Sequence, residues 1–424
     1  MRDPRTGLTP GRASRIARLV DVLATGDEER RSVEEVFQTA NQTVEDHQLV
    51  QRAQQEINDR LKGVAGQLMA QSAELRLSSP EFRRIAQSLR ARVGPGEHFE
   101  VDENGLGYNN LLYIATVLGE LQKTKAKDAD TDLAVLLVEE PEAHLHPHLQ
   151  SVLMGYLGEV STGEQPVQVF LTTHSPTLAA GADLDSLNVI HADSGGRIMS
   201  FPIKACDLQD VEKRYLQRYL DVTKSQLFFS RGVVLVEGIS EALLLPVLAK
   251  GVGIDLCERA ISVVNVQSVA FAPFAKLFHE GGLQLPAAMV TDADPPEEVF
   301  PAALDLDGMS ARAKNARALA KGTVRAFFSC KTFEYDLALA GNAARMATEY
   351  KTFRPGKGAD MENAVASAKD TAGKAKAVMQ NMDKADKAVF AQVLAESLAG
   401  DWRDFHVPKY LCGALEHVTG IDIP

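Results

Sequence analysis

The fold follows from one stretch of sequence, Gly232 to Lys250, which has the residues GVVLVEGISEALLLPVLAK. The unbroken apolar run at 233–236 is typical of a strand that is buried on both faces of a parallel sheet. Apolar residues at helical spacing follow Ser240, a residue type that often caps a helix N-terminus. The stretch therefore predicts a buried strand, a tight turn and a helix. Glu237 is expected at the carboxyl end of the strand, and Glu241 in the first helical turn.

Two further acids follow a second predicted strand. Residues 287–291 are apolar up to Thr291, and Asp292 and Asp294 come next. Residues two apart in an extended chain point to the same side, so both carboxylates are expected on one side. Ligands of open α/β sheets bind at the carboxyl ends of the strands. A single acid at a strand end is usually a solvated loop residue, but four acids at two strand ends indicate a site.

These residues resemble a known domain. VEGISE after one strand and DAD after the next are similar to the Toprim domain of topoisomerases, DnaG-type primases and OLD-family (overcoming lysogenisation defect) nucleases. The resemblance covers about 232–294 and implies an α/β fold with a Rossmann-like parallel sheet. It places a Toprim nuclease domain at 223–424, with a helical subdomain at about 339–405.

Two later segments resemble the same nucleases. The sequence FEYDLA, which begins at Phe333, is similar to the segment that closes the acidic site of OLD proteins. This resemblance implies Glu334 as a further metal ligand and Asp336 as a weaker candidate. VPKY resembles a late motif that brings a lysine into the nuclease site, which implies Lys409; a solvated surface lysine explains Lys409 equally well.

The chemistry of the acids favours hard divalent cations. Clustered Asp and Glu side chains without a nearby histidine suit Mg²⁺ or Mn²⁺. Two such ions about 4 Å apart can hold the attacking water and the leaving oxygen of a phosphodiester in line. We assign Glu237, Asp292 and Asp294 to metal binding, and Glu241 and Glu334 to a second metal or to the water. Without metal, at least one carboxyl is expected to be hard to ionise.

The middle of the chain resembles a different class of enzyme. A predicted strand at 133–138 precedes EEPEAHLHP, and another at 167–171 precedes TTHSP. The pair is similar to the Walker B, D-loop and switch-histidine strands of ABC/SMC-type ATPases, most of all in the OLD and RecF-like branch. The resemblance implies a Mg²⁺ role for Glu139, a water-polarising role for Glu140 and a γ-phosphate sensor in His174. The loop with Gly105 and Gly107 would be the signature loop.

The ATPase resemblance lacks one part. A nucleotide pocket of this class needs a GxxxxGK[ST] loop, and the sequence contains none. We therefore expect no ATP hydrolysis by this chain alone, and ATP only in a longer protein with that loop. In OLD proteins a helical dimerisation segment is inserted in the ATPase and the Toprim domain follows, so the resemblance implies the C-terminal portion of such a protein.

The remaining segments complete the domain plan. Residues 1–12 are expected to be a linker, 13–72 a helical hairpin, and 73–222 the C-terminal part of the ATPase domain. The hairpin has more apolar residues than it can cover alone, which predicts a homodimer; an intramolecular support layer is the alternative. The three histidines of residues 144–148 are expected to be surface or capping residues.

Composition sets outer limits. A length of 424 residues suits two or three domains, and a net charge of −12 argues against general binding to polyanions. Contact with DNA must then come from local basic patches and metal ions. The four cysteines form no CxxC pair, which favours neither a zinc site nor disulfides. The sequence has no signal-peptide pattern and no apolar run of the ~18 residues that a span needs, so we expect a cytoplasmic protein without membrane contact.

The function implied is a metal-dependent DNA endonuclease coupled, in a full protein, to an ATPase. A topoisomerase would need a nucleophilic tyrosine on a strand-passage domain, and a primase usually a zinc module. A non-catalytic, SMC-like DNA-binding or regulatory dimer is the third alternative. Sequence preference, nicking or double-strand cutting, and a role in phage defence or repair stay open.

Overall fold

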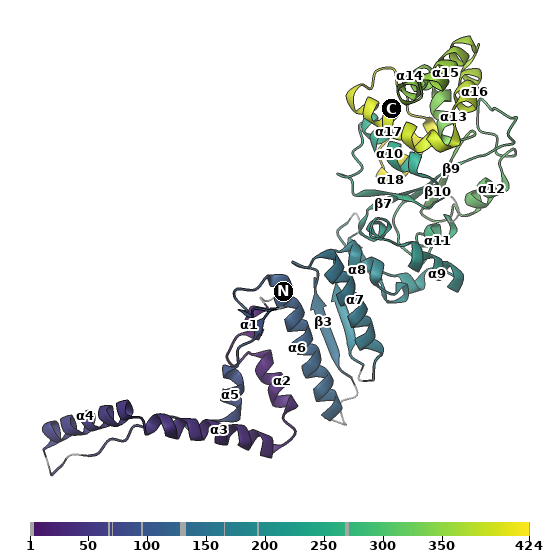
Figure 1. Cartoon of the computed structure of the whole chain (residues 1–424). Coiled ribbons are helices and arrows are strands. Elements are labelled where there is room, and N and C mark those ends of the chain that lie inside the picture. The colour runs from purple at the N-terminus through teal and green to yellow at the C-terminus, as the bar shows by residue number, and fades with distance from the viewer. Residues whose placement is uncertain are drawn as a thin grey trace. The chain divides into compact units, whose positions relative to one another are not determined.

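A computed structural model describes residues 4–66, 68–69, 71–94, 96–127, 133–164, 166–192, 195–267 and 271–423. The chain divides into two compact units, Met1–His174 and Ser175–Pro424 (Figure 1). The sequence analysis places a domain boundary at 222/223 instead. The difference arises because the apolar side chains of 179–220 pack against the second unit's sheet.

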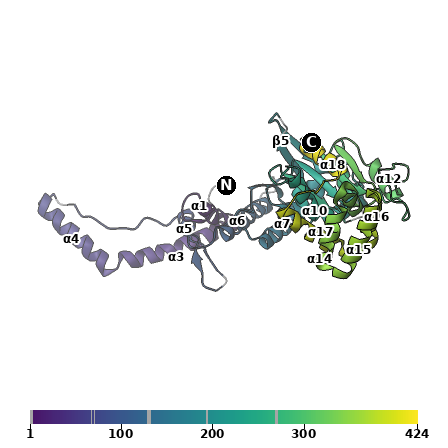
Figure 2. The ribbon, with the colours of Figure 1, turned by 90° about the horizontal axis from the view of Figure 1, so that it is seen from above.

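The first unit begins with helices. α1 (Arg5–Leu8) lies in the segment expected as a linker, and α2 (Arg15–Leu23) is capped by the hydroxyl of Ser14. α3 (Asp27–Glu45) and α4 (Gln48–Ala65) follow one another as an arm and do not fold back as the predicted hairpin (Figure 2).

The chain returns along this arm in an extended conformation. Side chains of the two arm helices bind the main chain of the returning segment: Asn58 Oδ1 accepts from Ala73 N at 2.6 Å, and Glu45 Oε1 accepts from Leu77 N at 2.8 Å. The arm therefore packs against this extended segment, and not as two helices against each other. The carboxylate of Glu45 is buried for this reason.

An α/β lobe completes the first unit. After α5 (Phe82–Ser88), β1 (Arg92–Val93) pairs antiparallel with β2 (Phe99–Glu100), and the long helix α6 (Leu106–Lys127) follows. β3 (Val135–Glu139) pairs in parallel with β4 (Gln168–Thr172), and α7 (Pro147–Thr162) connects them.

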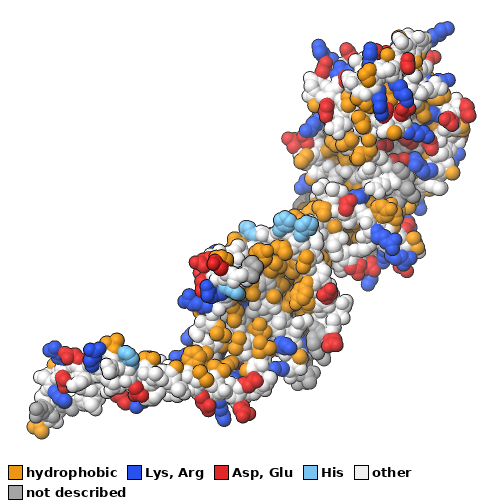
Figure 3. All heavy atoms as spheres, in the orientation of Figure 1, with side chains coloured by type: hydrophobic (Ala, Val, Ile, Leu, Met, Phe, Trp, Pro, Cys, Tyr) orange, Lys and Arg blue, Asp and Glu red, His pale blue; other side chains and the backbone are white. Residues whose placement is uncertain are grey.

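The two faces of the β3–β4 sheet differ. One face packs Leu136 and Val138 against apolar residues of α6 and α7. On the other face Leu137 is 75% exposed and Phe170 54% exposed. Figure 3 shows the hydrophobic side chains that gather in this region.

The second unit is built on a parallel sheet with the order β10-β9-β7-β8. Its strands are β7 (Gly232–Val236), β8 (Ile261–Asn265), β9 (Ala287–Asp292) and β10 (Val324–Ser329). All five residues of β7 are buried, as the apolar run predicts. α10 (Ile239–Gly251) follows β7 with Gly238 as its N-cap, so Ser240, the expected cap, lies inside the first turn.

Alternate residues of the sheet point into two different cores. Val234 and Val236 pack with α10, α18 (Lys409–Thr419) and the helical subdomain, whereas Val233 and Leu235 pack with the chain before β7 and with α11 (Phe271–Lys276) and α12 (Ala311–Ala318). The chain before β7 comprises α8 (Pro176–Gly181), η1 (Leu184–Ser186), β5 (Asn188–Ala192), β6 (Ile198–Pro202), η2 (Ile203–Ala205), α9 (Asp210–Tyr219) and η3 (Lys224–Phe229).

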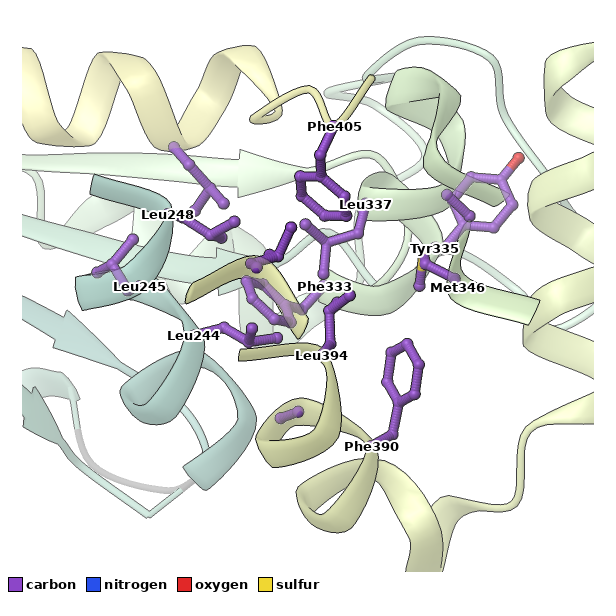
Figure 4. Close-up of a cluster of buried hydrophobic side chains, with 14 of the residues drawn as sticks. Leu244, Leu245, Leu248, Phe333, Tyr335, Leu337, Met346, Phe390, Leu394 and Phe405 are labelled. Carbon is purple, nitrogen blue, oxygen red and sulfur yellow. The ribbon is translucent and has the colours of Figure 1, made fainter. Parts of the chain in front are cut away.

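The helical subdomain shares its core with the sheet. It contains α13 (Phe333–Leu337), η4 (Ala338–Asn342), α14 (Ala343–Phe353), α15 (Pro355–Ser367), α16 (Thr371–Asn381), η5 (Lys384–Asp386) and α17 (Lys387–Gly400). Phe333, Leu337 and Leu394 meet Leu244 and Leu248 of α10 (Figure 4). The subdomain is therefore continuous with the Toprim-like core, and it brings α13 and α17 to the acidic residues.

Candidate active site

The candidate site lies where β7 and β9 end. The two strands are neighbours and run parallel, with Val236 opposite Val290, so their carboxyl ends share one edge of the sheet. Glu237 follows β7 directly, and Asp292 is the last residue of β9. Glu241 from α10 and Glu334 from α13 join them, and both side chains are buried. We call Glu237, Glu241, Asp292 and Glu334 the acidic cluster.

Glu237 is engaged through both carboxylate oxygens. Its Oε1 accepts a hydrogen bond from Thr291 Oγ1, and its Oε2 forms an ion pair with Arg312 Nη2 from α12. The main-chain amide of Asp292 also donates to Oε1, at 3.4 Å. Glu237 thus links the end of β7 to the end of β9 and to the first turn of α12.

Glu241 lies back over the turn that precedes its helix. A Cβ atom on Gly238 would come within 2.9 Å of Glu241 Oε2, so glycine at this position leaves room for the carboxylate. Burial raises the pKa of Glu241 to about 7, and the negative charges of Glu334 and Glu237 act in the same direction. Near neutral pH and without a cation, this carboxyl group is therefore only partly ionised.

Asp292 stands at the centre of the cluster. Ser329 Oγ, at the end of β10, donates to Asp292 Oδ1 at 3.0 Å. Desolvation raises the pKa of Asp292 well above its usual range, and the charges of Glu241, Glu237 and Glu334 add to the effect. This agrees with the expectation that at least one carboxyl of the group is hard to ionise.

Lys387 supplies a positive charge that the sequence analysis missed. Its Nζ lies 2.6 Å from Glu334 Oε2. Burial opposes the charge on Lys387, but Glu334, Asp292 and Glu241 outweigh it and raise its pKa. Lys387 is the first residue of α17 and lies in no recognisable motif, so only the packing of the helical subdomain reveals its position.

Three other predicted residues lie differently. Asp294 is exposed and has a φ of 51°, because β9 and its alternation end at Asp292. Asp336 turns to the main chain, where its two carboxylate oxygens each accept from Cys330 N at 2.8 Å. Lys409 is the exposed first residue of α18. The structure gathers none of these three with the acidic cluster.

Tyr410, the neighbour of Lys409, is a further residue that the sequence analysis missed. Its Oη is buried and has no hydrogen-bond partner among the described residues. Burial raises the pKa of Tyr410 well above its usual range, with Asp336, Asp292, Glu241 and Glu334 as the charges that add to it. The phenol therefore lies close enough to the acidic cluster to feel its charge. The VPKY motif includes Tyr410 directly after Lys409, so the same motif could have indicated this residue.

The donor chemistry of the cluster fits a hard divalent cation. Its four side chains offer only carboxylate oxygens, the ligands that Mg²⁺ and Mn²⁺ prefer. No three acidic, histidine or cysteine side chains in the described ranges are placed as a finished metal shell. Arg312 and Lys387 instead hold two of the carboxylates. A metal site here requires these ion pairs to rearrange.

The ATPase-like residues lie together in the first unit. Glu139 ends β3, and Glu140 follows with a φ of 45° and donates its amide to Thr172 O at 2.9 Å. His174 Nε2 lies 3.7 Å from Glu140 Oε1, which joins the expected base to the expected sensor.

The loop expected as the signature loop packs against the EEPEAHLHP turn. Gly105 precedes α6, and Gly107 lies in its first turn. A Cβ atom on Gly107 would come within 2.4 Å of His144 O, so this contact requires glycine. His146 caps α7 by accepting from His148 N, and His144 and His148 are exposed, which confirms that these histidines are surface or capping residues.

Comparison with known proteins defines the class first. Residues 20–179 match the AAA ATPase domain family, and 228–294 match the family described as Overcoming lysogenization defect protein-like, TOPRIM domain. The second unit therefore carries a Toprim domain, and the acidic cluster lies at its sheet edge. Among the described residues, no helix is both long and apolar enough to cross a membrane.

Named relatives then show what the chain is similar to. The chain is 24% identical over 237 residues to "Endonuclease GajA" of Bacillus cereus (strain HuB5-5), which is 50% of this chain and 34% of that protein. It is 26% identical over 168 residues to "OLD nuclease" of Thermus scotoductus (strain ATCC 700910 / SA-01), which is 39% of this chain and 30% of that protein. The chain is thus homologous to OLD nucleases and combines an ATPase-type region with an OLD-like Toprim domain. It matches about a third of the length of these relatives.

Solved structures include the C-terminal region of the Xanthomonas campestris pv. campestris OLD protein. It is 27% identical, with a TM-score of 0.34, and the match covers 46% of this chain and 95% of that one. The C-terminal region of the Burkholderia pseudomallei OLD protein is 23% identical, also with a TM-score of 0.34, over 45% and 98% of the two chains.

Proposed function

We propose that this chain is a cytoplasmic, metal-dependent DNA endonuclease whose Toprim domain hydrolyses phosphodiester bonds. The observation that carries the proposal is the convergence of four carboxylates from β7, α10, β9 and α13 at one sheet edge. Nuclease relatives that share the Toprim domain support DNA as the substrate. In a longer protein with a P-loop, we propose that cleavage is coupled to the ATPase.

The residues divide into ligands and counter-charges. Glu237 and Asp292 would hold one Mg²⁺ or Mn²⁺, and Glu241 and Glu334 a second or its water. Bound ions would supply an activated water and neutralise charge on the phosphate. Lys387 adds positive charge beside these carboxylates, which favours the negative transition state.

The other predicted site residues keep outer positions in this proposal. Lys409 is exposed and available to the DNA backbone, and Asp294 is exposed two residues after Asp292. Asp336 fixes the turn after β10 through the amides of Cys330 and Lys331. We therefore place Asp336 in support of Glu334, two residues before it in α13.

Plasmid cleavage tests the nuclease proposal. We expect nicking or linearisation with Mg²⁺ or Mn²⁺, and a loss of at least about 100-fold in Asp292→Asn, since ~1.4 kcal/mol of transition-state stabilisation is worth tenfold in rate. Asn keeps the shape of Asp292 and removes a repelled charge, so the fold should persist. Asp360→Asn on the exposed surface of α15 is the matched control. A wild type that is inactive with both metals, or an active Asp292→Asn, would contradict the proposal.

One observation favours the non-catalytic alternative. Arg312 and Lys387 already neutralise Glu237 and Glu334, and an inert Toprim domain would keep such pairs permanently. The two functions differ in metal binding: an inert domain would give no heat on titration with Mg²⁺ or Mn²⁺. Neither function requires ATP turnover, and we expect none above background for this chain.

Assembly completes the proposal. We propose a homodimer through the arm helices α3 and α4, which expose apolar side chains along most of their length. These are Val33, Val36, Phe37, Val44, Leu49, Ile57 and Val64.

A further inference from the structure

Arg312 connects solvent to the buried part of the acidic cluster. It lies in the first turn of α12, and its side chain is 48% exposed, whereas the side chain of Glu237 that it contacts is only 9% exposed. Nη2 forms the ion pair with Glu237 Oε2. One end of this arginine therefore lies in the site while much of the side chain remains in water.

This ion pair occupies the oxygen that a metal ion would use. Thr291 and the amide of Asp292 donate to Glu237 Oε1, and Arg312 pairs with Oε2, so a cation that binds Oε2 meets the guanidinium there. A divalent ion on Oε2 and a guanidinium within hydrogen-bond distance would repel each other strongly in a buried site. Metal binding to Glu237 therefore competes with Arg312.

Arg312 differs from the second cation of the cluster. The side chain of Lys387 is 34% exposed, and the charges of three acids hold it beside Glu334 against the cost of burial. Arg312 comes from a different helix, on the side of the sheet opposite α17, and has more of its side chain in water. If the ion pair with Glu237 breaks, the side chain of Arg312 can thus turn to a molecule outside the acidic cluster while α12 stays in place. Guanidinium groups bind phosphate oxygens in pairs, with a geometry that an ammonium group lacks.

We propose that Arg312 is a DNA-phosphate contact that metal binding releases. In the metal-free protein it neutralises Glu237; when a divalent ion binds Glu237, Arg312 turns outward and binds a backbone phosphate beside the acidic cluster. The inference rests on the proposed function, because it takes the acidic cluster as the metal site and DNA as the ligand. It makes Arg312 a residue that links the two binding events.

Thermodynamic linkage between metal binding and DNA binding makes this proposal measurable. If metal binding frees Arg312 for DNA, metal must tighten DNA binding, and DNA must tighten metal binding by the same factor. One released arginine should contribute about one phosphate contact. The slope of log affinity against log salt should then steepen by about 0.9 when metal is added.

The test uses the full chain with Ca²⁺ as the metal probe and a fluorescein-labelled 20-base-pair duplex. Calorimetry measures Ca²⁺ affinity, and anisotropy measures duplex affinity with and without Ca²⁺ over a range of salt. We expect Ca²⁺ to tighten duplex binding of the wild type by about 3- to 10-fold, the range of a modest coupling between sites. In Arg312→Gln the extra salt slope should disappear and the gain should fall to the part that the bound ions supply by themselves, while Ca²⁺ affinity stays equal or increases.

Arg317→Gln is the matched control, since it removes the same charge from an exposed position of the same helix. It should keep both the gain and the salt slope. A Ca²⁺ affinity more than about threefold weaker in Arg312→Gln would instead assign Arg312 to holding Glu237 in place and would overturn the proposal. A full gain in that variant would overturn it as well.

The outcome is separable from that of the nuclease assay. A wild type that couples Ca²⁺ and duplex binding but leaves plasmid intact with Mg²⁺ and Mn²⁺ would refute the nuclease and support the role of Arg312. A wild type that cleaves plasmid without any Ca²⁺-dependent gain in duplex affinity would refute the role of Arg312 alone.

Discussion

Glu241 and Asp292 are carboxyl groups placed where charge is costly. Both lose water on folding and both face other acids, so their pKa values rise. Ser329 offsets part of this cost by a hydrogen bond to Asp292, and the positive charge of Lys387 lowers the pKa of both groups. The stability of the cluster should therefore depend both on pH and on bound cations.

The pKa of Glu241 predicts how the metal-free protein responds to pH. The pKa is about 7 in the folded protein and 4.5 for an ordinary glutamate, so the folded state binds this proton more tightly. Its contribution to stability is full below about pH 4.5 and is lost as pH rises through about 7. At ~1.4 kcal/mol per pKa unit, the loss is about 3 kcal/mol. Melting in EDTA should show a falling Tm across this window and a flatter profile in Glu241→Gln.

Divalent cations should reverse this trend. Mg²⁺ binds ionised carboxylates, so its stabilising effect should grow as pH rises through 7. A Tm in EDTA that rises between pH 5 and 8 by the same amount in wild type and Glu241→Gln would contradict the assignment.

Tyr410 gives a second prediction at this scale. A buried hydroxyl without a partner costs about 1–3 kcal/mol, so Tyr410→Phe should leave the metal-free protein equally stable or more stable. If the hydroxyl donates to a ligand when metal binds, the variant should bind Mg²⁺ about 3- to 10-fold more weakly, which corresponds to one hydrogen bond of about 1 kcal/mol. Thermal shift with and without Mg²⁺ measures both effects.

Tyr350→Phe is the control for Tyr410→Phe. Tyr350 Oη donates to Asp386 Oδ2 at 2.7 Å. Burial raises the pKa of Tyr350, and the charges that add to the effect are those of Asp386 and Asp383, not those of the acidic cluster. This variant should lose stability and keep its metal affinity. Unchanged metal affinity in Tyr410→Phe would limit the phenol to a packing role.

At the scale of elements, the arm is the part of the chain that depends least on a packed core. α3 and α4 follow each other, and the return chain covers them through hydrogen bonds from side chains such as Glu45, Gln54 and Asn58. These polar bonds leave the apolar stripe of the helices open. A helix whose apolar side is exposed gains stability when it packs against a partner.

The arm therefore predicts the oligomeric state. We expect light scattering to find a dimer at micromolar concentration and a monomer for the double variant Val36→Ser, Phe37→Ser. Val36 is 66% exposed and Phe37 43%, so the variant should not disturb the fold of one chain. Val389→Ser, at a 51% exposed position of α17, is the control and should remain dimeric. A wild-type monomer would refute the dimer.

At the scale of the whole molecule, the unit that carries the acidic cluster begins at Ser175, well before the Toprim family match at 228–294. The segment before β7 buries Leu184, Ile203 and Leu216 in the same cluster as Val233 and Met289. These contacts cover one face of the parallel sheet together with α11 and α12. The segment is therefore part of the fold that carries the acidic cluster.

Two fragments test this division. Residues 175–424 should fold and show the same Mg²⁺-dependent stabilisation as the full chain. Residues 223–424 should be insoluble or unfolded, since each lost Leu or Ile contact costs about 2–5 kcal/mol against a total stability of about 5–15 kcal/mol. Circular dichroism and thermal melting decide the outcome. A well-folded 223–424 would show that the earlier segment is dispensable.

The sequence by itself determined the strands β7 and β9, the resemblance to OLD nucleases and three residues of the acidic cluster. The β7 and β9 patterns are local, since each is a run of apolar residues followed directly by an acid. Because the acid is the next residue in the chain, it must lie at the carboxyl end of its strand. Glu237, Glu241 and Asp292 were predictable for this reason, and the resemblance of FEYDLA added Glu334. The same locality placed Glu140 and His174 after their two strands, and the structure brings the two side chains within 3.7 Å of each other.

Only the tertiary structure decided which charges face these acids. Arg312 pairs with a residue 75 positions away and Lys387 with one 53 positions away, through helices whose docking depends on the whole core. Asp294 does not lie on the same side as Asp292, because β9 ends at Asp292. The carboxylate of Asp336 accepts hydrogen bonds from main-chain amides and does not join the acidic cluster. The arm and the 174/175 division likewise follow from long-range packing. Local patterns place acids at strand ends, but burial and opposite charge, which set their chemistry, come from residues that are distant in the chain.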